Sequence, residues 1–252
     1  MCHNHSAAPE PPDDVAVRDC LTSGTDPVLY LRFTGAAGTG GGVIVLLTDI
    51  FGVNPFYRYL SALLTAEGYE VVMPDMFHRV GAAEPGRDGA LARRGLLDDK
   101  LAVDDVERVI EHTTDSKRPF GVLGFCLGGS FALLTAATHD NQATATYYAF
   151  PKGAPGAKVA VTEPLQVAGS IAGPVLGHWG RQDYIDAGEV DLLATTLDSA
   201  PGETEVRWYD EAGHSFLAGL TEPGHPAARS AADSWQRTLR FFSTRLNPVP
   251  AA

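Results

Sequence analysis

Cysteine, basic charge and long apolar segments are all scarce in this chain of 252 residues. Its three cysteines, Cys2, Cys20 and Cys126, have the spacing of neither a disulfide framework nor a zinc site. A low, odd count is typical of proteins in a reducing compartment. Lysine and arginine together number 19 against 31 acidic residues, which gives a formal net charge of −12. Because this charge would repel a polyanion, we expect no nucleic-acid partner.

The apolar segments are too short for a membrane span. The longest apolar run, VIVLL, occupies residues 43–47, whereas roughly 20 residues are needed to cross a bilayer. The first residues, MCHNHSAAPEPPDD, also lack the apolar centre of a signal peptide. We therefore expect a cytoplasmic protein with no membrane partner. No feature marks an obligate dimer surface, so we expect a monomer.

The N-terminal residues differ in composition from the rest of the chain. Residues 1–14 are rich in proline, alanine and acidic residues, which predicts a flexible arm; we extend this arm to residues 1–20. A single domain is expected over residues 21–246, followed by a tail at 247–252. Cys2, His3 and His5 could ligate a metal in principle. Three ligands on a flexible segment are a weak pattern, and we expect no metal there.

From residue 27 onward, strand patterns and helix patterns alternate. Residues 41–49 form a continuous apolar run, which is typical of a strand covered on both faces. Residues 55–69 instead carry apolar side chains at helical spacing. The further predicted strands are 28–33 (at the sheet edge), 70–75, 119–125, 143–150, 173–180 and 204–210, and the further helices are 98–113, 126–138, 189–199 and 226–244. This alternation predicts an α/β fold with a mainly parallel sheet and helices on both faces.

The stretch GVLGFCLGGS at residues 121–130 carries the strongest local motif. It places Cys126 where the nucleophile stands in the G-x-S-x-G pattern, between Gly124 and Gly128. That pattern forms a sharp turn from a strand into a helix and exposes the nucleophile at the helix N-terminus, where the helix dipole favours a thiolate. The alternative is that Cys126 is a small buried thiol that fills the core.

Other reactive side chains follow other predicted strands. Because the site of a parallel sheet lies beyond the carboxyl ends of its strands, we expect these side chains to meet there. The chain order Cys126, Asp183, His214 matches the order of nucleophile, acid and base in α/β-hydrolases. His178 and His225 are alternatives to His214 as the base, and Asp186 is an alternative to Asp183.

Each residue type in this set has a chemical role. A thiol must lose its proton to attack, and His214 can accept that proton and later donate it to the leaving group. Asp183 can hold the imidazole in the required tautomer. The backbone N–H groups of Leu127 and Ile50 can form an oxyanion hole.

These residues resemble the dienelactone hydrolases, the cysteine-dependent branch of the α/β-hydrolases. The resemblance covers most of residues 28–245 and rests on five anchors in order, DIFGVN (49–54), PDMFHR (74–79), GFCLGG (124–129), GRQD (180–183) and YDEAGHSF (209–216). It implies an α/β-hydrolase fold and hydrolysis of lactones or esters through an acyl-enzyme, as in the conversion of dienelactone to maleylacetate. No cofactor or metal is implied.

The resemblance also implies roles for two charged residues. Asp49 stands where the family usually has a glutamate that interacts with the resting thiol, and the alternative is that it only braces its loop. Arg79 matches an arginine that binds a substrate carboxylate, so the substrate is expected to be anionic. The family's second such arginine is replaced by Ala218. Arg181 could substitute for it or could be a solvated loop residue.

Three functions remain open from the sequence. The main hypothesis is a cysteine-dependent hydrolase of lactones or small esters. The second is a hydrolase of the same class that acts on a different, neutral substrate, which the residues Asp49 and Ala218 favour. The third is a non-catalytic binding protein on the same scaffold. The Gly/Pro-rich stretch 151–173 could be a lid or a surface loop.

Overall fold

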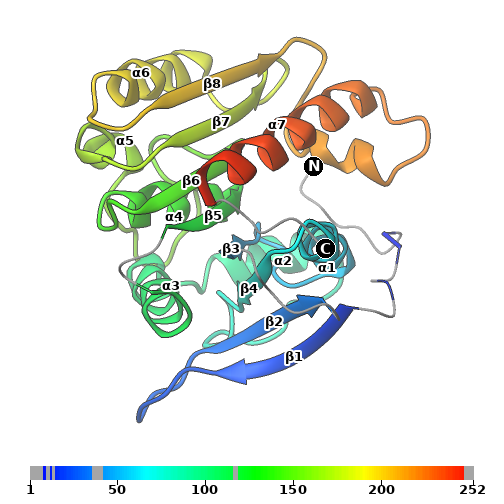
Figure 1. Cartoon of the computed structure of the whole chain (residues 1–252), viewed down its shortest axis with the longest axis vertical. Helices are drawn as coiled ribbons and strands as arrows, with labels where there is room; N and C mark the ends of the chain where they lie inside the picture. The colour runs from blue at the N-terminus through cyan, green and yellow to red at the C-terminus, as the bar shows by residue number, and fades with distance from the viewer. Residues whose placement is uncertain (1–7, 10–11, 13–14, 36–41, 116–118, 247–252) are drawn as a thin grey trace.

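The computed structural model describes residues 8–9, 12, 15–35, 42–115 and 119–246. Within them, eight strands form one sheet in the order β1-β2-β4-β3-β5-β6-β7-β8 (Figure 1). The strands are β1 (Val15–Leu21), β2 (Leu29–Gly35), β3 (Val43–Leu47), β4 (Glu70–Pro74), β5 (Phe120–Phe125), β6 (Gln142–Tyr147), β7 (Val175–Gly180) and β8 (Thr204–Tyr209). The helices are α1 (Pro55–Ala66), α2 (Gly86–Arg94), α3 (Asp99–Thr113), α4 (Leu127–Ala136), α5 (Pro164–Val167), α6 (Ala187–Asp198) and α7 (Ala228–Leu246), with two short 3₁₀ helices, η1 (Ala168–Ser170) and η2 (Phe216–Leu220).

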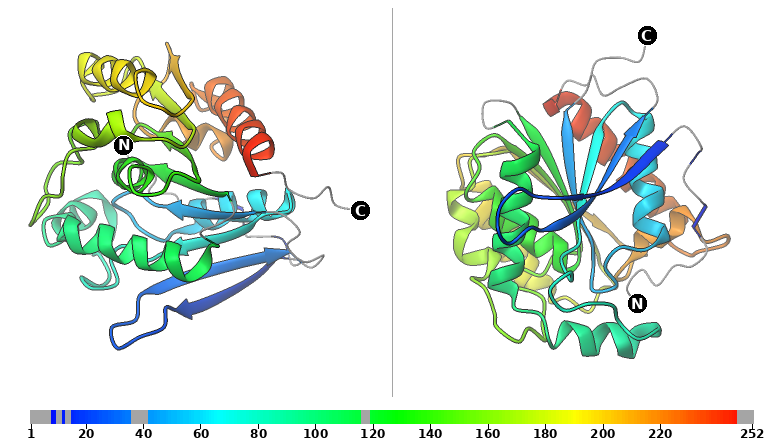
Figure 2. Two further views of the ribbon diagram at one scale, coloured as in Figure 1. Left: turned by 60° about the vertical axis from the view of Figure 1, so that its left-hand side comes forward. Right: turned by 90° about the horizontal axis from the view of Figure 1, so that it is seen from below.

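Strands β3 to β8 are parallel to one another, and β1 and β2 are antiparallel additions at one end of the sheet. Helices α1 and α7 lie on one face of the sheet, and α3, α4 and α6 lie on the other (Figure 2). Because both faces are covered, every residue of β4, β5, β6 and β7 is buried. The predicted α/β-hydrolase architecture is therefore confirmed.

Strand β1 corrects the predicted boundary of the N-terminal arm. Val15–Leu21 pairs along its whole length with β2, with Val17 opposite Phe33. Residues 15–20 therefore belong to the sheet, and the arm expected over 1–20 was wrong for them. The predicted strand 28–33 is therefore not at the sheet edge, since β1 pairs with β2 on its outer side. The candidate metal ligands Cys2, His3 and His5 and the tail 247–252 lie outside the described residues.

Helix α2 was not predicted, and it anchors the long stretch after β6. Arg94 at its C-terminal end is buried and pairs with Asp99 at 2.5 Å, and it also donates to the carbonyl oxygen of Ala154 at 2.7 Å. The backbone N–H of Asp99 donates to the carbonyl oxygen of Val159 at 2.9 Å. Residues 151–159 are thus fixed to the α2–α3 junction, which argues for a packed loop rather than a moving lid.

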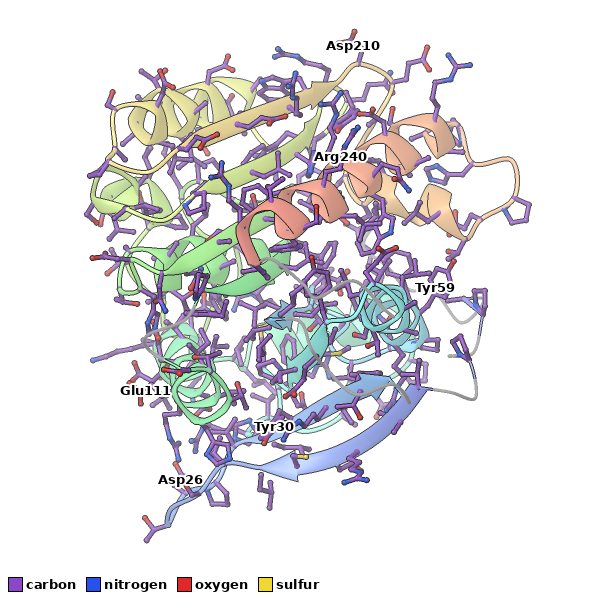
Figure 3. The ribbon with its side chains drawn as sticks, viewed as in Figure 1. Asp26, Tyr30, Tyr59, Glu111, Asp210 and Arg240 are labelled. Atoms are coloured by element: carbon purple, nitrogen blue, oxygen red, sulfur yellow. The ribbon has the colours of Figure 1, made fainter. Side chains whose placement is uncertain are left out.

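Charged side chains cover the outside of the molecule (Figure 3). Asp26, in the hairpin between β1 and β2, and Asp210, after β8, mark opposite ends of the sheet. None of the helices in the described part of the chain combines the length and the apolar character that crossing a bilayer requires.

Candidate active site

Cys126 lies at a strained turn between β5 and α4. Its backbone angles are φ 55° and ψ −115°, and its side chain is buried. The flanking glycines permit the turn, because a Cβ on Gly124 would lie 2.3 Å from the carbonyl oxygen of Gly128, and one on Gly128 would lie 2.4 Å from that of Leu47. The G-x-C-x-G motif therefore forms the predicted nucleophile elbow, with the cysteine directly before the first residue of α4.

The end of β3 packs against this elbow. The backbone N–H of Gly128 donates to the carbonyl oxygen of Thr48 at 3.1 Å. Asp49 follows and is completely buried, and its Oδ1 accepts from the backbone N–H of Phe51 at 2.8 Å. Its own N–H donates to the hydroxyl of Tyr57 at 3.3 Å. These contacts fix the Asp49 carboxylate in the loop after β3, next to Thr48, which contacts the elbow.

His214 and Asp183 meet although 31 residues separate them. The Nδ1 atom of His214 lies 2.9 Å from Oδ2 and 3.0 Å from Oδ1 of Asp183. Their side chains are 1% and 2% exposed, respectively. Oδ1 of Asp183 also accepts from the backbone N–H of Ile185 at 3.1 Å, which fixes the carboxylate. Donation from Nδ1 to the carboxylate selects the tautomer that leaves Nε2 able to accept a proton.

Close packing of two strand ends brings this pair together. Gly180 ends β7, and a Cβ there would lie 2.0 Å from the carbonyl oxygen of Ala212 in the loop after β8. The backbone N–H of Gln182 donates to the same carbonyl at 2.9 Å. Only glycine allows so close an approach. It places Asp183 and His214 on facing loops.

The alternative residues occupy other positions. His178 is buried in the middle of the fold and contacts the hydroxyls of Tyr209 and Thr238 at 3.1 and 3.2 Å. His225 accepts from the backbone N–H of Ala227, and Asp186 caps the N-terminus of α6 by accepting from Glu189. The structure therefore pairs Asp183 with His214, as expected.

Three aromatic rings surround the imidazole of His214. The ring centroids of Tyr184, Tyr148 and Phe150 lie 4.6, 4.8 and 5.6 Å from its centroid. Tyr184 is 62% exposed, so it covers the imidazole from the solvent side. Sequence reasoning missed these residues, although Tyr184 directly follows Asp183. Tyr148 lay inside the predicted strand 143–150, whereas β6 ends one residue before it, at Tyr147.

The backbone around the site is unusually strained. In the described residues, the non-glycine residues with positive φ are Cys126 at 55°, Tyr148 at 41° and Ser215 at 62°. Cys126 is the candidate nucleophile, Tyr148 packs against His214 with its ring tilted, and Ser215 follows His214. Strained residues of this kind concentrate at functional sites. Their grouping identifies this edge of the sheet as the candidate active site without reference to any motif.

The two predicted oxyanion donors lie on opposite sides of the elbow contact. Leu127 is the first residue of α4, and Ile50 lies in the loop after β3. Within the described part of the chain, the backbone N–H of neither residue donates to a protein acceptor. Among the residues that the structure describes, no group of three or more His, Cys, Asp and Glu side chains is arranged to hold a metal ion.

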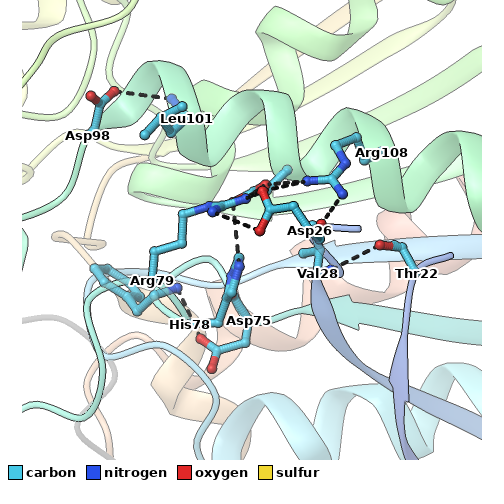
Figure 4. A network of polar contacts seen from close by, with 11 residues as sticks. Thr22, Asp26, Val28, Asp75, His78, Arg79, Asp98, Leu101 and Arg108 are labelled. Atoms are coloured by element: carbon cyan, nitrogen blue, oxygen red, sulfur yellow. Dashed lines mark hydrogen bonds and ion pairs between the residues drawn. The ribbon is translucent and has the colours of Figure 1, made fainter. Parts of the chain in front are cut away.

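Arg79, which the resemblance assigns to substrate binding, pairs with two aspartates in this structure (Figure 4). Its Nε and Nη2 donate to the carboxylate of Asp105 at 2.6 and 2.7 Å, and its Nη1 and Nη2 donate to that of Asp26 at 3.3 and 2.7 Å. Arg108 joins the cluster through the same two aspartates. Arg79 therefore ties the β1–β2 hairpin to α3, and its guanidinium is already engaged by two carboxylates.

The structure also shows the positions of Arg181 and Ala218. Arg181 lies over the ring of Trp208, 3.9 Å from the centroid. Ala218 is buried in η2. Arg93, which the sequence did not single out, instead contacts the loop after β3, where its Nη2 donates to the carbonyl oxygen of Ile50 at 2.9 Å.

Comparison with known proteins gives consistent matches. The family described as the Dienelactone hydrolase family matches residues 33–246. A protein named carboxymethylenebutenolidase from Rhodococcus opacus is 64% identical over 247 residues, which are 98% of each chain. Another of that name from Pseudomonas putida is 32% identical over 82% of this chain and 88% of its own.

Solved structures give the same fold. A putative dienelactone hydrolase from Klebsiella pneumoniae superposes with a TM-score of 0.78 at 24% identity, covering 91% of this chain and 98% of its own. A bacterial brefeldin A esterase superposes with a TM-score of 0.65 at 15% identity, covering 94% of this chain and 79% of its own. At these identities the likeness establishes the fold alone.

Proposed function

The chain belongs to the dienelactone hydrolase family and is a hydrolase, and from this premise we propose that it opens a lactone or a small ester through a triad of Cys126, His214 and Asp183. The relatives named carboxymethylenebutenolidase support a dienelactone as the substrate. The observation that carries the proposal is the strained Cys126 at the elbow together with the buried Asp183–His214 pair, whose Nδ1 and Oδ2 atoms lie 2.9 Å apart.

The first half of the reaction forms a thioester. The Cys126 thiol gives its proton to Nε2 of His214, and the thiolate attacks the carbonyl carbon of the ring. The N–H groups of Leu127 and Ile50 stabilise the oxyanion. When the intermediate collapses, the C–O bond of the ring breaks and the leaving oxygen takes the proton from His214. For a dienelactone this oxygen is an enol, which becomes the ketone of maleylacetate.

The second half releases the acid and restores the enzyme. His214 removes a proton from water, and the hydroxide attacks the thioester carbon. The C–S bond breaks, and the proton on His214 returns to the thiolate of Cys126. One water molecule is consumed for each ring opened. Asp183 stabilises the charged imidazole in both halves, and Tyr184 limits the access of bulk water to it.

Asp49 is the remaining charged group next to the elbow. Its complete burial and its bond from Phe51 support a role in keeping the resting thiol protonated until a substrate arrives, because a second negative charge beside a buried carboxylate is unfavourable. A neutral lactone or ester is a second candidate substrate. It is favoured by the engagement of Arg79 with Asp26 and Asp105 and by the apolar Ala218.

Replacement of Cys126 tests the proposal. We expect Cys126→Ala to lower kcat for dienelactone hydrolysis by at least about 10³-fold, because the covalent step is lost. Wild-type protein quenched during turnover should carry one acyl group on the peptide that contains Cys126, and hydroxylamine should remove it.

Cys20 provides the matched control, because it is a second free thiol in the sheet but lies in β1, away from the site. Cys20→Ala should hydrolyse the lactone at the wild-type rate. A Cys126→Ala protein with full hydrolytic activity would exclude the thioester mechanism. Stoichiometric alkylation of Cys126 without turnover of any lactone or ester would instead indicate a binding protein.

A further inference from the structure

Arg93 differs from Arg79 and Arg94 in its partners. Arg79 pairs with Asp26 and Asp105, and Arg94 pairs with Asp99. Arg93 forms no ion pair with any described residue, and its buried Nε has no hydrogen-bond partner among them. Its one polar contact is the donation from Nη2 to the carbonyl oxygen of Ile50.

The surroundings of Arg93 compensate its charge only through the ring of Phe77, a cation–π contact, and through carboxylates that form no ion pair with it. The guanidinium lies 3.9 Å from the centroid of the Phe77 ring. Burial lowers the pKa of Arg93, and the negative charges of Asp75 and Asp49 oppose this change from a distance. A partly buried cation without a contacting carboxylate is unfavourable unless an anion joins it. The free protein therefore holds a desolvated positive charge that a bound anion would neutralise.

A cavity of about 370 Å³ lies in front of this group, and its volume suits a small molecule. Its lining includes Phe51, Val53, Asn54 and Arg93. The one acidic side chain in the lining is Glu84, which is exposed. Most of the cavity wall is apolar, so Arg93 is the group that could fix the orientation of a ligand.

Arg93 is also connected to the reacting groups through a single loop. It contacts Ile50, a proposed oxyanion donor, and the same loop contacts the elbow through the bond from Gly128 to Thr48. Helix α2 holds Arg93 in place, because the next residue, Arg94, is locked by Asp99 and Ala154. The guanidinium thus stands at a fixed position against the loop that carries Ile50.

We propose that Arg93 is the anion-binding residue of this site and that it binds a carboxylate of the substrate in the cavity beside Phe51. This inference rests on the proposed function, since it names the charge of the substrate that Cys126 attacks. A carboxylate accepts two parallel hydrogen bonds from a guanidinium. This pairing would fix the orientation of the lactone ring and increase the affinity for the substrate. Glu84 opposes this binding weakly, because water screens it.

Two substrates separate charge recognition from catalysis. Dienelactone carries a carboxylate, and the same methylene butenolide ring without the carboxylate is neutral. For Arg93→Gln we expect KM for dienelactone to rise about 10- to 100-fold, since hydrogen bonds to charged groups are lost, while KM for the neutral ring stays unchanged. Arg93→Lys should recover part of the loss. Arg87→Gln removes an exposed charge from the same helix and should change neither value. Glu84→Gln should lower KM for dienelactone.

A second measurement does not require hydrolysis. Iodoacetate and iodoacetamide alkylate thiols in the same way, but only iodoacetate is an anion. The measured quantity is the alkylation rate of Cys126 with iodoacetate divided by its rate with iodoacetamide. This ratio should fall several-fold in Arg93→Gln, rise in Glu84→Gln and stay constant in Arg87→Gln.

The outcomes distinguish this inference from the proposed function. If Arg93→Gln raises KM equally for both substrates and leaves the alkylation ratio unchanged, the inference is overturned. Arg93 would then only stabilise the loop that contains Ile50. If wild-type protein hydrolyses only the neutral ring, the inference also fails, although the hydrolase mechanism stands. A ratio that depends on Arg93 in a protein that hydrolyses neither lactone would support the anion site and contradict the proposed function.

Discussion

Two histidines, one inside β7 and one in the loop after the neighbouring β8, show how the same side chain can have different partners. His214 follows β8 and His178 lies in β7, and both imidazoles are almost completely buried. His214 contacts the carboxylate of Asp183, whereas His178 contacts the hydroxyls of Tyr209 and Thr238. Burial alone therefore does not decide whether an imidazole can take a proton. The charge of the partner does, because only a carboxylate compensates for the imidazolium.

The surroundings of the two rings follow the same division. His178 is stacked on Tyr147, with 4.6 Å between ring centroids, inside a closed network of hydroxyl groups. Burial lowers the pKa of His178 to about 3, and Arg237 and Arg207 act in the same direction against Asp233. This ring stays neutral at any ordinary pH and supports the core. The ring of His214 has a carboxylate partner and lies 4.6 Å from the exposed ring of Tyr184, and it is the ring that the proposed mechanism uses to exchange protons.

The largest expected effect comes from removing the charge that makes His214 different. Asp183→Asn keeps the shape of the pair but removes the carboxylate and permits the wrong tautomer. We expect kcat to fall about 10³- to 10⁴-fold, as in triads that lose their acid. Steady-state hydrolysis of the lactone measures this.

Asp186→Asn is the control for this change, since Asp186 lies three positions further along and caps α6. Asparagine is an equally good cap, so both activity and stability should be retained. Full activity in Asp183→Asn would mean that His214 does not need the carboxylate and that the comparison between the two histidines is wrong.

A smaller effect is expected on stability, from His178. Its pKa is about 3 in the folded chain and about 6.5 in an unfolded one. Between these values the unfolded chain binds one more proton, so the free energy of unfolding decreases as the pH falls below about 6.5. The loss is about 1.4 kcal/mol per pH unit and about 3 kcal/mol at pH 4. Denaturant unfolding from pH 7 to pH 4 measures it.

Substitution assigns this slope to one residue. His178→Gln keeps hydrogen-bonding capacity but has no proton to take up, so its stability should fall less steeply with acid than that of the wild type. His225→Gln, in the loop after η2, should leave the slope unchanged. If the wild type and His178→Gln have parallel pH profiles, His178 is not held neutral by the fold.

The smallest expected effect concerns the aromatic cover of His214. Tyr184→Ala removes a ring contact worth about 0.5–1.5 kcal/mol and admits water to the pair. We expect kcat to fall about 2- to 12-fold, whereas Tyr184→Phe should keep the wild-type rate. The ¹H NMR titration of His214 should shift in the alanine variant only. Equal rates for all three proteins would show that Tyr184 does not shield the imidazole.

The sequence predicted those parts of the molecule that depend on strand ends. Asp183 and His214 were expected to meet because parallel strands deliver their carboxyl ends to one edge, and the structure confirms the contact. The sequence contains glycines at 124, 128 and 180. Only the structure shows that Gly180 lets the backbone of Ala212 approach closely. The catalytic roles of these residues stay predictions.

The features that the sequence did not reveal share a physical cause. Strand β1 has half-buried and exposed positions, with no fully buried one, and follows a polar segment. Its sequence therefore lacks the apolar pattern by which a strand is predicted. Arg79 matches a motif, but its partner Asp26 lies 53 residues earlier, and nothing in the sequence indicates that they pair. Arg93 lies in α2, a short polar helix. Ion pairs between distant residues are decided by the folded arrangement and not by local pattern.

The strained turns at Cys126, Tyr148 and Ser215 have a consequence for any attempt to make this protein more heat resistant. Each such position costs on the order of 1–3 kcal/mol, while a domain is stable by only about 5–15 kcal/mol in total. Glycine at position 148 or 215 would relax the backbone without strain. Selection for survival on heating alone would therefore favour changes next to the imidazole, and the most durable variants would be among the least active.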